Sequence, residues 1–387
     1  MRAAVLGGKL QGIAAAYLAH QENWGVVLVD RHADAPAREL ADIFYCFDIF
    51  EPGRLCQVLQ EVDFVIPAIE QAPALEFIAR TAGEMGKKIL FDREAYAVSS
   101  SKLRSDEFFA ELGIPAPRKW PGCSYPLLVK PSGQSGSHGV RKVHDEAELK
   151  AFTLGHADVK HWVIQEFLMG PSYSIEIVAH HGRCCTFQVT ELEMDEIYDC
   201  KRVLAPCNLS TELMQRFSAC AVRLAEGLHL DGIMDVEVIL HEGELKVLEI
   251  DARLPSQTLT VVQQSSGINA VEVYQSDGLP GCPSDYTLLE PQRHVLYEHI
   301  EVTEQAVKVC GEHIMGGHGP LHYRKGFFGA DEALTSYEKG KKQKKWVATL
   351  LFTADSREAV CRKEKAVVRR IMEACAVPDY IDEVPKE

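Results

Sequence analysis

The 387-residue sequence contains no uninterrupted apolar run of about 18 residues, the length that a membrane-spanning helix needs. Its first twenty residues, MRAAVLGGKLQGIAAAYLAH, lack the basic flank and small-residue cleavage site of a secretory signal. The twelve cysteines include no CxxC pair, so neither a zinc site nor a disulfide framework is indicated. We therefore expect a cytoplasmic protein whose cysteines are free and mostly buried thiols.

Basic residues are outnumbered, with 41 Lys and Arg against 56 Asp and Glu, and the formal net charge is −15. A protein that binds nucleic acid presents a basic surface, so nucleic acid is not expected as a partner. The basic run KGKKQKKW at 339–346 is interpreted as a solvated loop. Neither an internal repeat nor a low-complexity linker divides the chain, and its length indicates two or three domains.

Short apolar runs alternate with helical patterns through the first hundred residues. Four of these runs predict strands, namely RAAVLGG, WGVVLVD, DFVIPAI and KKILFD. Between them, apolar residues recur at helical spacing, as in LQGIAAAYLAHQ and ALEFIARTAGEMG. Strand–helix alternation at this spacing predicts βαβ units and a parallel sheet, which is the α/β class.

After residue 100 the pattern changes to the α+β class. SSKLRSDEFFAELG predicts a helix that ends at Gly113. YPLLVKPSGQSGSHGVRKV predicts two strands joined by a Gly/Ser-rich turn, and the helical DEAELKAF and the strand HWVIQEFL follow. Mostly antiparallel strands are expected from residue 173 onward, with a helix at 211–228, a hairpin in IMDVEVILHEGELKVLEID, and a final strand and helix.

The segment VLGGKLQG follows the first predicted strand and resembles a dinucleotide-binding loop. If Gly7 opens the G-x-G-x-x-G pattern, however, the middle glycine that lets a pyrophosphate approach is replaced by Lys9. The loop still lies at the carboxyl end of a strand, where open α/β sheets bind ligands. We interpret Lys9, Leu10 and Gln11 as lining a pocket; the alternative is a plain turn.

A second glycine-rich segment, VKPSGQSGSHGV at 129–140, is more specific. Gly133, Gly136 and Gly139 keep the turn free of bulk, so that its backbone N–H groups can bind phosphate oxygens, and Lys130 supplies a positive charge. The turn is not a P-loop, because no G-K-[ST] follows at the required spacing. The alternative is a flexible surface hairpin.

The segment EIDAR at 249–253 places three charged side chains on one face of one strand, because residues two apart on a strand point the same way. Asp235 and Glu237 share a face of the preceding strand, and HEGE predicts a hairpin turn that brings Glu237 close to Glu249. Carboxylates gathered in this way repel one another unless a cation lies among them, and magnesium prefers oxygen ligands. The alternative is an edge strand with solvated ion pairs.

The order of these motifs resembles that of the ATP-grasp ligases: Lys102, then Lys130 with its Gly/Ser turn, then QEFLMG, then Glu237 and EIDAR. The resemblance covers nearly the whole chain. It implies an ATP-grasp fold, in which two α+β subdomains hold ATP after an N-terminal parallel-sheet domain. The expected domains are residues 1–100 (pre-ATP-grasp), 101–178 (small subdomain with the phosphate loop) and 179–387 (C-terminal subdomain with the metal site).

The resemblance also implies roles for individual residues. ATP and Mg²⁺ would be the cofactors, and Arg253 would steady an acyl phosphate. The residues assigned to the nucleotide are Lys9, Lys102, Lys130, Ser135, Gly136, Ser137, Gly139, Gln165, Glu166 and Leu168, and those assigned to the metal are Glu237, Glu249 and Asp251. Many family members have asparagine at the position of Asp251, but both side chains supply an oxygen. We find no clear acidic residue after FLMG for the ribose hydroxyls.

A narrower resemblance is to the 3-methylornithine–lysine ligases of pyrrolysine biosynthesis. It rests on GGKLQGIAAAYL, YCFDI, GIMDVE, IDARLPSQT, SSGIN and YEH. It implies that the carboxyl group of (3R)-3-methyl-D-ornithine is joined to the ε-amine of L-lysine while ATP becomes ADP and phosphate. Two further interpretations stay open, namely a ligase for another amino-acid or purine-type substrate, and a nucleotide-binding module without turnover.

Two diamino-acid substrates require carboxylates for their ammonium groups and donors for their carboxylates. The candidates for this role are Leu10, Gln11, Glu70, Ser174, Glu176, Asp235, Ser256 and Gln257. Arg253 and Asp235 are the catalytic candidates, with Asp235 either a base or an ammonium anchor. Glu176 has the alternative of a structural ion pair. Glu70 ends an apolar strand at the ligand edge of the sheet, which favours a role in binding.

Overall fold

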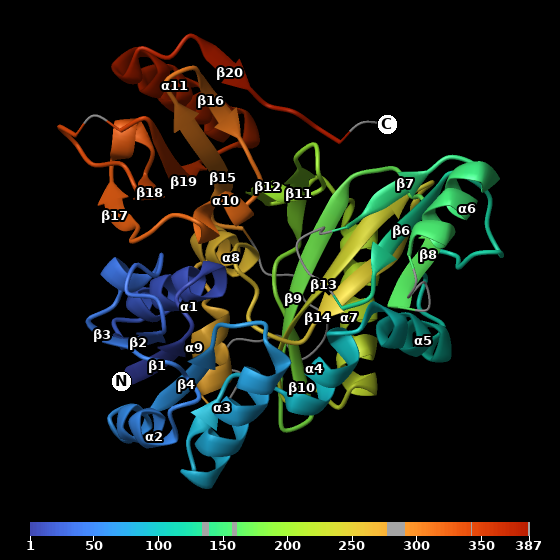
Figure 1. Cartoon of the computed structure of the whole chain (residues 1–387), viewed down its shortest axis with the longest axis horizontal. Helices are drawn as coiled ribbons and strands as arrows, with labels where there is room; N and C mark the ends of the chain where they lie inside the picture. The colour runs from blue at the N-terminus through green and yellow to red at the C-terminus, as the bar shows by residue number, and fades with distance from the viewer. Residues whose placement is uncertain (134–138, 157–160, 277–290, 342, 386–387) are drawn as a thin grey trace.

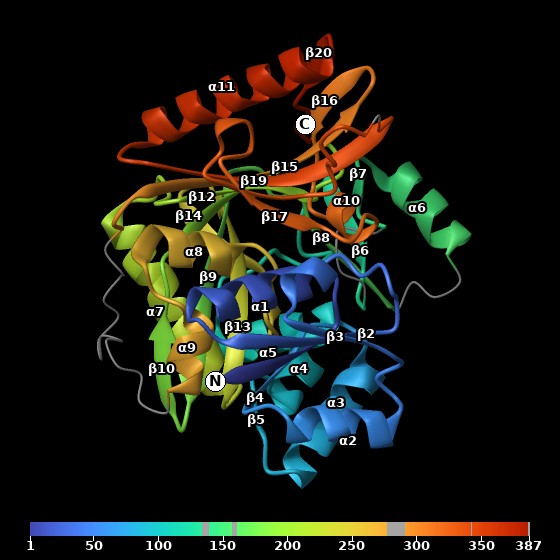
Figure 2. The same cartoon turned by 90° about the vertical axis from the view of Figure 1, so that its left-hand side faces the viewer.

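The computed structural model describes residues 1–133, 139–156, 161–276, 291–341 and 343–385. Three β-sheets organise this part of the chain: a five-stranded sheet, a three-stranded sheet and a twelve-stranded sheet. Figures 1 and 2 show the five-stranded sheet beside the large sheet, with the three-stranded sheet and helix α6 at the opposite side of the molecule.

The five-stranded sheet is parallel throughout and has the order β3-β2-β1-β4-β5. Its elements are β1 Arg2–Leu6, α1 Leu10–Gln21, β2 Gly25–Asp30, η1 Arg38–Leu40, β3 Ile43–Cys46, α2 Pro52–Gln60, β4 Phe64–Pro67, α3 Ala72–Glu84 and β5 Lys88–Ile89. The central strands are buried on both faces, which explains their unbroken apolar runs. The α/β prediction is thereby confirmed, although the short strand β3 was not predicted.

Helix α1 is buried on nearly all sides, as expected of a helix that is apolar all round. One side packs on the five-stranded sheet and the other contacts helices α8 and α9, whose bounds follow below. The amide of Asn269 donates to the carbonyl of Leu18 at 2.7 Å, and Gln264 donates to the Tyr17 hydroxyl at 2.8 Å. The N-terminal sheet is therefore fixed to the large sheet through a shared core.

The three-stranded sheet is antiparallel with the order β7-β6-β8. The elements of this region are α4 Arg93–Ser99, α5 Lys102–Leu112, β6 Leu127–Pro131, β7 Arg141–Val143, α6 Glu146–Gly155 and β8 Trp162–Glu166. Helix α5 begins after Ser101, whose hydroxyl accepts from the Arg104 N–H, and ends at Gly113 in the left-handed region. The predicted end of this helix is therefore confirmed.

The large sheet follows the path β14-β13-β9-β11-β12-β15-β19-β18-β17, with β10, β16 and β20 at its sides. Its strands are β9 Ser172–His180, β10 Arg183–Thr186, β11 Thr190–Met194, β12 Cys200–Ala205, β13 Gly232–His241, β14 Glu244–Asp251, β15 His294–Thr303, β16 Ala306–Val309, β17 His322–Lys325, β18 Glu332–Thr335, β19 Lys345–Ala354 and β20 Asp379–Ile381. The helices around it are α7 Thr211–Gly227, α8 Thr258–Ser266, α9 Ala270–Gln275, α10 His313–Gly316, η3 Phe327–Gly329 and α11 Arg357–Cys375. Residue 178, the expected domain boundary, lies inside β9.

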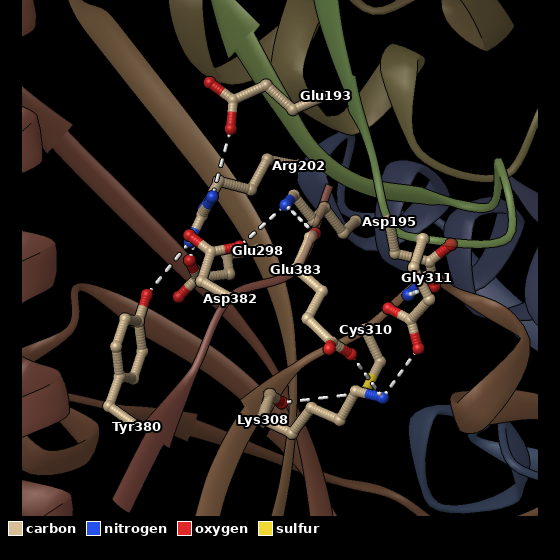
Figure 3. A network of polar contacts seen from close by, with 12 residues as sticks. Glu193, Asp195, Arg202, Glu298, Lys308, Cys310, Gly311, Tyr380, Asp382 and Glu383 are labelled. Carbon is tan, nitrogen blue, oxygen red and sulfur yellow. Dashed lines mark hydrogen bonds and ion pairs between the residues drawn. The ribbon is translucent and has the colours of Figure 1, made fainter. Parts of the chain in front are cut away.

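The C-terminal strand β20 pairs with β16 and leads into a set of ion pairs (Figure 3). We call the residues Glu193, Lys201, Arg202, Glu298 and Asp382 the C-terminal network. Arg202 lies at its centre and contacts all three carboxylates, with 2.7 Å to Asp382 and 3.0 Å to Glu193. Lys201 contacts Asp382 at 2.6 Å. The network thus ties the end of the chain to strands β12 and β15.

The structure bears on two expectations from the sequence, the absence of a membrane-spanning helix and the free state of the cysteines. Among the described helices, none combines the length and the apolar character needed to cross a bilayer. Ten cysteines of the described residues are free thiols, but only Cys123 and Cys310 among them are buried, so the expectation of mostly buried thiols is wrong. Cys185, however, is disulfide-bonded, so the prediction of free thiols is wrong at this residue.

Candidate active site

Three neighbouring cavities lie where the sheets meet. The first-sheet cavity, of about 570 Å³, is formed at the carboxyl ends of β1, β2 and β4. The acid cavity, of about 140 Å³, is lined by carboxylates of β13 and β14. The lysine cavity, of about 170 Å³, is lined by Lys102 and Lys130. Because neighbouring cavities share lining residues, the three form a continuous row through the molecule.

The first-sheet cavity contains the loop that follows β1. Lys9, Leu10 and Gln11 line it, so the predicted pocket is present. Gly7 has φ +115°, and a Cβ atom there would lie 2.3 Å from a backbone oxygen, which excludes any larger residue. The Gly8 N–H donates to the Asp30 carboxylate at 2.7 Å. The loop is therefore fixed by its own backbone, while Lys9 lies away from the lysine cavity and outside its lining.

The hairpin of β13 and β14 forms one wall of the acid cavity. Glu242 and Gly243 both have positive φ, as a two-residue hairpin turn requires. A β-bulge between Glu237 and Val238 then shifts the register by one residue, so that Glu237 lies opposite Glu249 and Asp235 opposite Asp251. The sequence prediction that Glu237 and Glu249 lie close together is confirmed. Although β14 is an edge strand, its charged residues line a cavity near the start of α5 and are not fully solvated.

The carboxylates of this wall outnumber the cationic side chains near them, and their pKa values are shifted. Burial and the nearby Glu249 and Asp251 raise the pKa of Glu237 to about 8. Burial also raises the pKa of Asp251 to about 6, although Arg253 opposes the change. Burial would raise the pKa of Glu249 as well, but Lys102, 2.8 Å away, and Lys130 hold it at about 2. An oxygen-only cluster of this kind fits a hard divalent cation.

Arg253 links the acid cavity to the first-sheet cavity. Its guanidinium contacts Asp251 at 2.8 Å and Glu70 at 3.0 Å. Glu70, which lies shortly after β4, also accepts a hydrogen bond from the Gln11 amide at 2.8 Å. The guanidinium is therefore held between the two cavities, at a point where an anionic group could contact it.

The lysine cavity contains two cations and an amide. Lys130 is buried, and this burial lowers the pKa of its ammonium group; its Nζ donates to the Leu248 carbonyl at 3.3 Å. Gln165 is 1% exposed and its amide nitrogen has no partner among the described residues. Leu168 completes the apolar part of the lining. A planar ligand with anionic groups at one end would match this arrangement.

Glu166 and the Gly/Ser turn differ from the other residues of the predicted nucleotide site. The Glu166 carboxylate is occupied, because Lys246 and Arg118 approach it at 2.6 and 2.7 Å and hold its pKa at about 2 in spite of burial. Only its backbone and stem therefore remain for a ligand. Ser135, Gly136 and Ser137 lie outside the described residues. Gly139 is described and exposed, with φ +80°.

The other predicted substrate residues are divided by burial. Asp235, Ser256 and Gln257 line the acid cavity. Ser174 and Glu176 are almost wholly buried on β9, where the Ser174 hydroxyl donates to Glu176 at 2.9 Å, and neither lines any of the three cavities. Burial raises the pKa of Glu176 to about 7.

Sequence reasoning missed several residues of the site, among them Glu312 and His313. They lie at the start of α10 and line the acid cavity, and His313 lines the first-sheet cavity as well. A hydrogen bond to Asp199, at 2.9 Å, raises the pKa of His313 to about 9. The segment CGEHIMGG carries no recognisable motif, and no signal in the sequence could have placed it here.

Comparisons with known proteins agree with this geometry. Residues 99–257 match the family model described as an ATP-grasp domain. The chain is 36% identical over 314 residues to the 3-methyl-D-ornithine–L-lysine ligase of Methanosarcina acetivorans, covering 80% of this chain and 83% of the relative. It is 37% identical over 313 residues to the enzyme of the same name from Methanosarcina mazei, covering 80% and 81%.

Solved structures support the fold. The biotin carboxylase domain of the 2-oxoglutarate carboxylase from Hydrogenobacter thermophilus, solved with MgADP and bicarbonate, aligns with a TM-score of 0.72 at 15% identity, covering 94% of this chain and 89% of that one. At this identity the likeness shows the fold alone. Together with the family match, it confirms the predicted ATP-grasp fold with an N-terminal parallel sheet.

Proposed function

Because the chain belongs to the family of 3-methyl-D-ornithine–L-lysine ligases, we propose that it joins the carboxyl group of (3R)-3-methyl-D-ornithine to the ε-amine of L-lysine in pyrrolysine biosynthesis. The reaction would consume ATP and pass through an acyl phosphate. The observation that carries the proposal is the paired register of Glu237 with Glu249 and Asp235 with Asp251, beside two lysines and one arginine.

In this proposal the nucleotide occupies the lysine cavity. Lys102 and Lys130 contact its phosphates, and Gln165 and Leu168 lie at its base. The unpartnered amide nitrogen of the buried Gln165 supports this placement, because a buried donor without an acceptor is costly. Lys9 lines the first-sheet cavity, so its assignment to the nucleotide has no support from its position.

The metal would be magnesium, held by Glu237, Glu249 and Asp251. The fit rests on the donor set, which consists of carboxylate oxygens; burial and, after it, the neighbouring carboxylates raise the pKa values of Glu237 and Asp251. When bound, magnesium neutralises charge on a transferring phosphoryl group. Lys102 keeps Glu249 ionised and thus ready to act as a ligand.

The amino-acid substrates would occupy the acid and first-sheet cavities. Arg253 lies where it can bind the carboxyl group that is activated, and Glu70 and Asp235 supply negative charge for ammonium groups. Leu10, Gln11, Ser256 and Gln257 complete the lining. Ser174 and Glu176 would act from beneath the cavity floor, because they do not line it.

The division of the chain also remains a proposal. We propose an N-terminal unit of residues 1–100, a small subdomain from 101, and a C-terminal subdomain. The second boundary is better placed before Ser172 than at residue 178, because β9 pairs with β13 in the large sheet. The cytoplasmic location expected from the sequence stays a prediction.

The test is mass spectrometry of the product formed from lysine, 3-methyl-D-ornithine, ATP and Mg²⁺. We expect the ligated dipeptide-like product, with one ADP released for each bond. The alternative of a ligase for another amino-acid or purine-type substrate is tested by measuring phosphate release with other amino acids. A module without turnover would bind ATP but release no ADP. Because Lys9 replaces the middle glycine of the dinucleotide motif, Mg-ATP should raise the melting temperature whereas NAD should not.

A further inference from the structure

Glu312 is held firmly at the edge of the acid cavity. Its backbone N–H donates to the Cys200 carbonyl at 3.1 Å, and its carboxylate accepts a hydrogen bond from the Ser256 hydroxyl at 2.6 Å. The preceding Gly311 donates to Asp195 at 2.9 Å, and a Cβ atom at this glycine would lie 2.0 Å from Asp199. The backbone can therefore approach β12 closely, and the carboxylate of Glu312 keeps one position.

The charge around Glu312 differs from that around four of the other carboxylates of the acid cavity. Glu70, Asp199, Glu249 and Asp251 each pair with a cationic side chain. Among the described residues, by contrast, no cationic side chain lies within ion-pair distance of the Glu312 carboxylate. A carboxylate that is fixed, partly buried and not paired with a cation of the protein is suited to bind an ammonium group of a ligand.

The chemistry of the proposed reaction requires such a group. The ε-ammonium of lysine has an ordinary pKa of about 10.4, so near neutral pH it must lose a proton before nitrogen can attack. We propose that Glu312 is the catalytic residue that binds this ammonium group and accepts its proton, which deepens the proposed function and rests on it.

The ε-ammonium gives one proton to the Glu312 carboxylate and becomes a neutral amine. The nitrogen lone pair forms the C–N bond to the acyl carbon, and the bond from that carbon to the phosphate oxygen breaks. Phosphate leaves with the electron pair and takes the second proton of the amine, giving the amide and hydrogen phosphate.

The surroundings of Glu312 are compatible with this role. Burial raises its pKa to about 7, the Ser256 hydrogen bond opposes the change, and Asp199 raises it further. The other titratable groups that face it are His313 beside it, Cys200 of β12, Arg253, Glu237 of β13 and Tyr297 of β15. A base whose pKa is near the working pH transfers protons most effectively.

Asp235 and Glu176, two of the three carboxylates expected to bind ammonium groups, are placed less well for this role; the third, Glu70, pairs with Arg253. Asp235 lies in register between Asp251 and Glu176, on the wall assigned to the metal. Glu176 is 0% exposed and lines none of the three cavities. Of Asp235, Glu176 and Glu312, Glu312 is the one that lies off the metal wall and still lines the acid cavity.

The test compares two nucleophiles in Glu312→Gln, in the wild type and in the matched exposed control Glu304→Gln. Hydroxylamine is largely neutral near pH 7, so it can trap the acyl phosphate as a hydroxamate without a base. We expect Glu312→Gln to form hydroxamate from 3-methyl-D-ornithine, ATP and Mg²⁺ at the wild-type rate. Its kcat for ligation of lysine should fall on the order of 10²–10⁴, the range for loss of an acid–base group. This loss should shrink as pH rises toward the pKa of lysine.

Each result has a distinct meaning. Equal loss of hydroxamate formation and ligation in Glu312→Gln would overturn the role of Glu312 as a base, as would unchanged ligation or a loss that is independent of pH. Absence of hydroxamate in the wild type would overturn the proposed function and, with it, this inference. Normal hydroxamate formation by the variant also shows that it is folded and binds ATP.

Discussion

The acid cavity and the C-terminal network are two clusters of charge built on strands of the same large sheet, yet their charges are balanced differently. In the network, every carboxylate has a cationic partner: Glu193, Glu298 and Asp382 all contact Arg202 (Figure 3). In the acid cavity, seven carboxylates among the described lining residues face only Arg253 and His313 as cations of the same lining. A balanced cluster needs no ligand, whereas an unbalanced one needs added cations.

The same distinction holds for single residues. Within the acid cavity, Asp235, Glu237 and Glu312 have no cationic side chain at ion-pair distance among the described residues. We infer that the network stabilises the fold and that the acid cavity binds cationic ligands, namely metal ions and ammonium groups. Substitutions should therefore affect stability in one cluster and activity in the other.

The largest effect is expected when the centre of the network is removed. Arg202→Met leaves Glu298, which is 0% exposed, buried without its partner. Removing one partner of a buried ion pair typically costs about 3–5 kcal/mol. We expect a clear fall in melting temperature, measured by thermal unfolding. Arg369→Met, at an exposed position on α11, is the control and should have little effect. An unchanged melting temperature in Arg202→Met would show that the network does not stabilise the fold.

The acid cavity should respond in the opposite sense. Glu249→Gln removes a proposed metal ligand and should lower the rates of acyl-phosphate formation and of ligation together, on the order of 10²–10³ for loss of one stabilising group. Activity should fall far more than stability. The measurement is steady-state ADP release, with and without lysine, beside a melting curve. A Glu249→Gln variant with a lowered melting temperature but unchanged specific activity would contradict the comparison.

The buried His299 belongs neither to the C-terminal network nor to the acid cavity, and its hydrogen-bond partners are uncharged. It lies between Gln257 and Thr349, at 3.0 and 2.8 Å, and burial lowers its pKa to about 4. Between about pH 6.5 and pH 4, His299 is protonated in the unfolded chain but stays neutral in the folded protein. Stability should therefore fall as pH drops from about 6.5 to 4, by about 1.4 kcal/mol per pH unit from this group.

His299→Gln should flatten this part of the stability curve. The measurement is denaturant unfolding at several pH values for both proteins. Parallel curves would mean that His299 is protonated in the fold.

The smallest effect is expected for Glu70→Gln. Glu70 pairs with Arg253 and accepts from Gln11, and by hypothesis it binds only an amino-acid substrate. A hydrogen bond to a charged group contributes about 1.5–3 kcal/mol, so the KM for one amino acid, which we expect to be lysine, should rise about tenfold or more. ATP affinity should stay nearly intact. Weaker ATP binding with unchanged amino-acid KM values would place the nucleotide in the first-sheet cavity.

Much of the site was predictable because it depends on local rules. The period of two along a strand puts Glu249, Asp251 and Arg253 on one face, and the turn residues predict the hairpin. The pairing of Glu237 with Glu249 also depends on a β-bulge, which the turn and the strand period do not predict. Ser101 and Gly113 mark the ends of α5, which places Lys102 in its first turn. The occupied carboxylate of Glu166 was not predictable, because its partners Arg118 and Lys246 lie 48 and 80 residues away.

The sequence by itself determined the parallel N-terminal sheet and the turn of the β13–β14 hairpin, because strand periodicity, helix caps and turn residues act within a few positions. Only the tertiary structure decided that Glu312 and His313 enter the acid cavity, and that Arg202 meets Asp382 across 180 residues of chain. Such contacts depend on how whole elements pack. Gly311 allows a close approach to Asp199, and β20 pairs with β16. The residues around Gly311 and β20 form no local pattern from which these partners could be predicted.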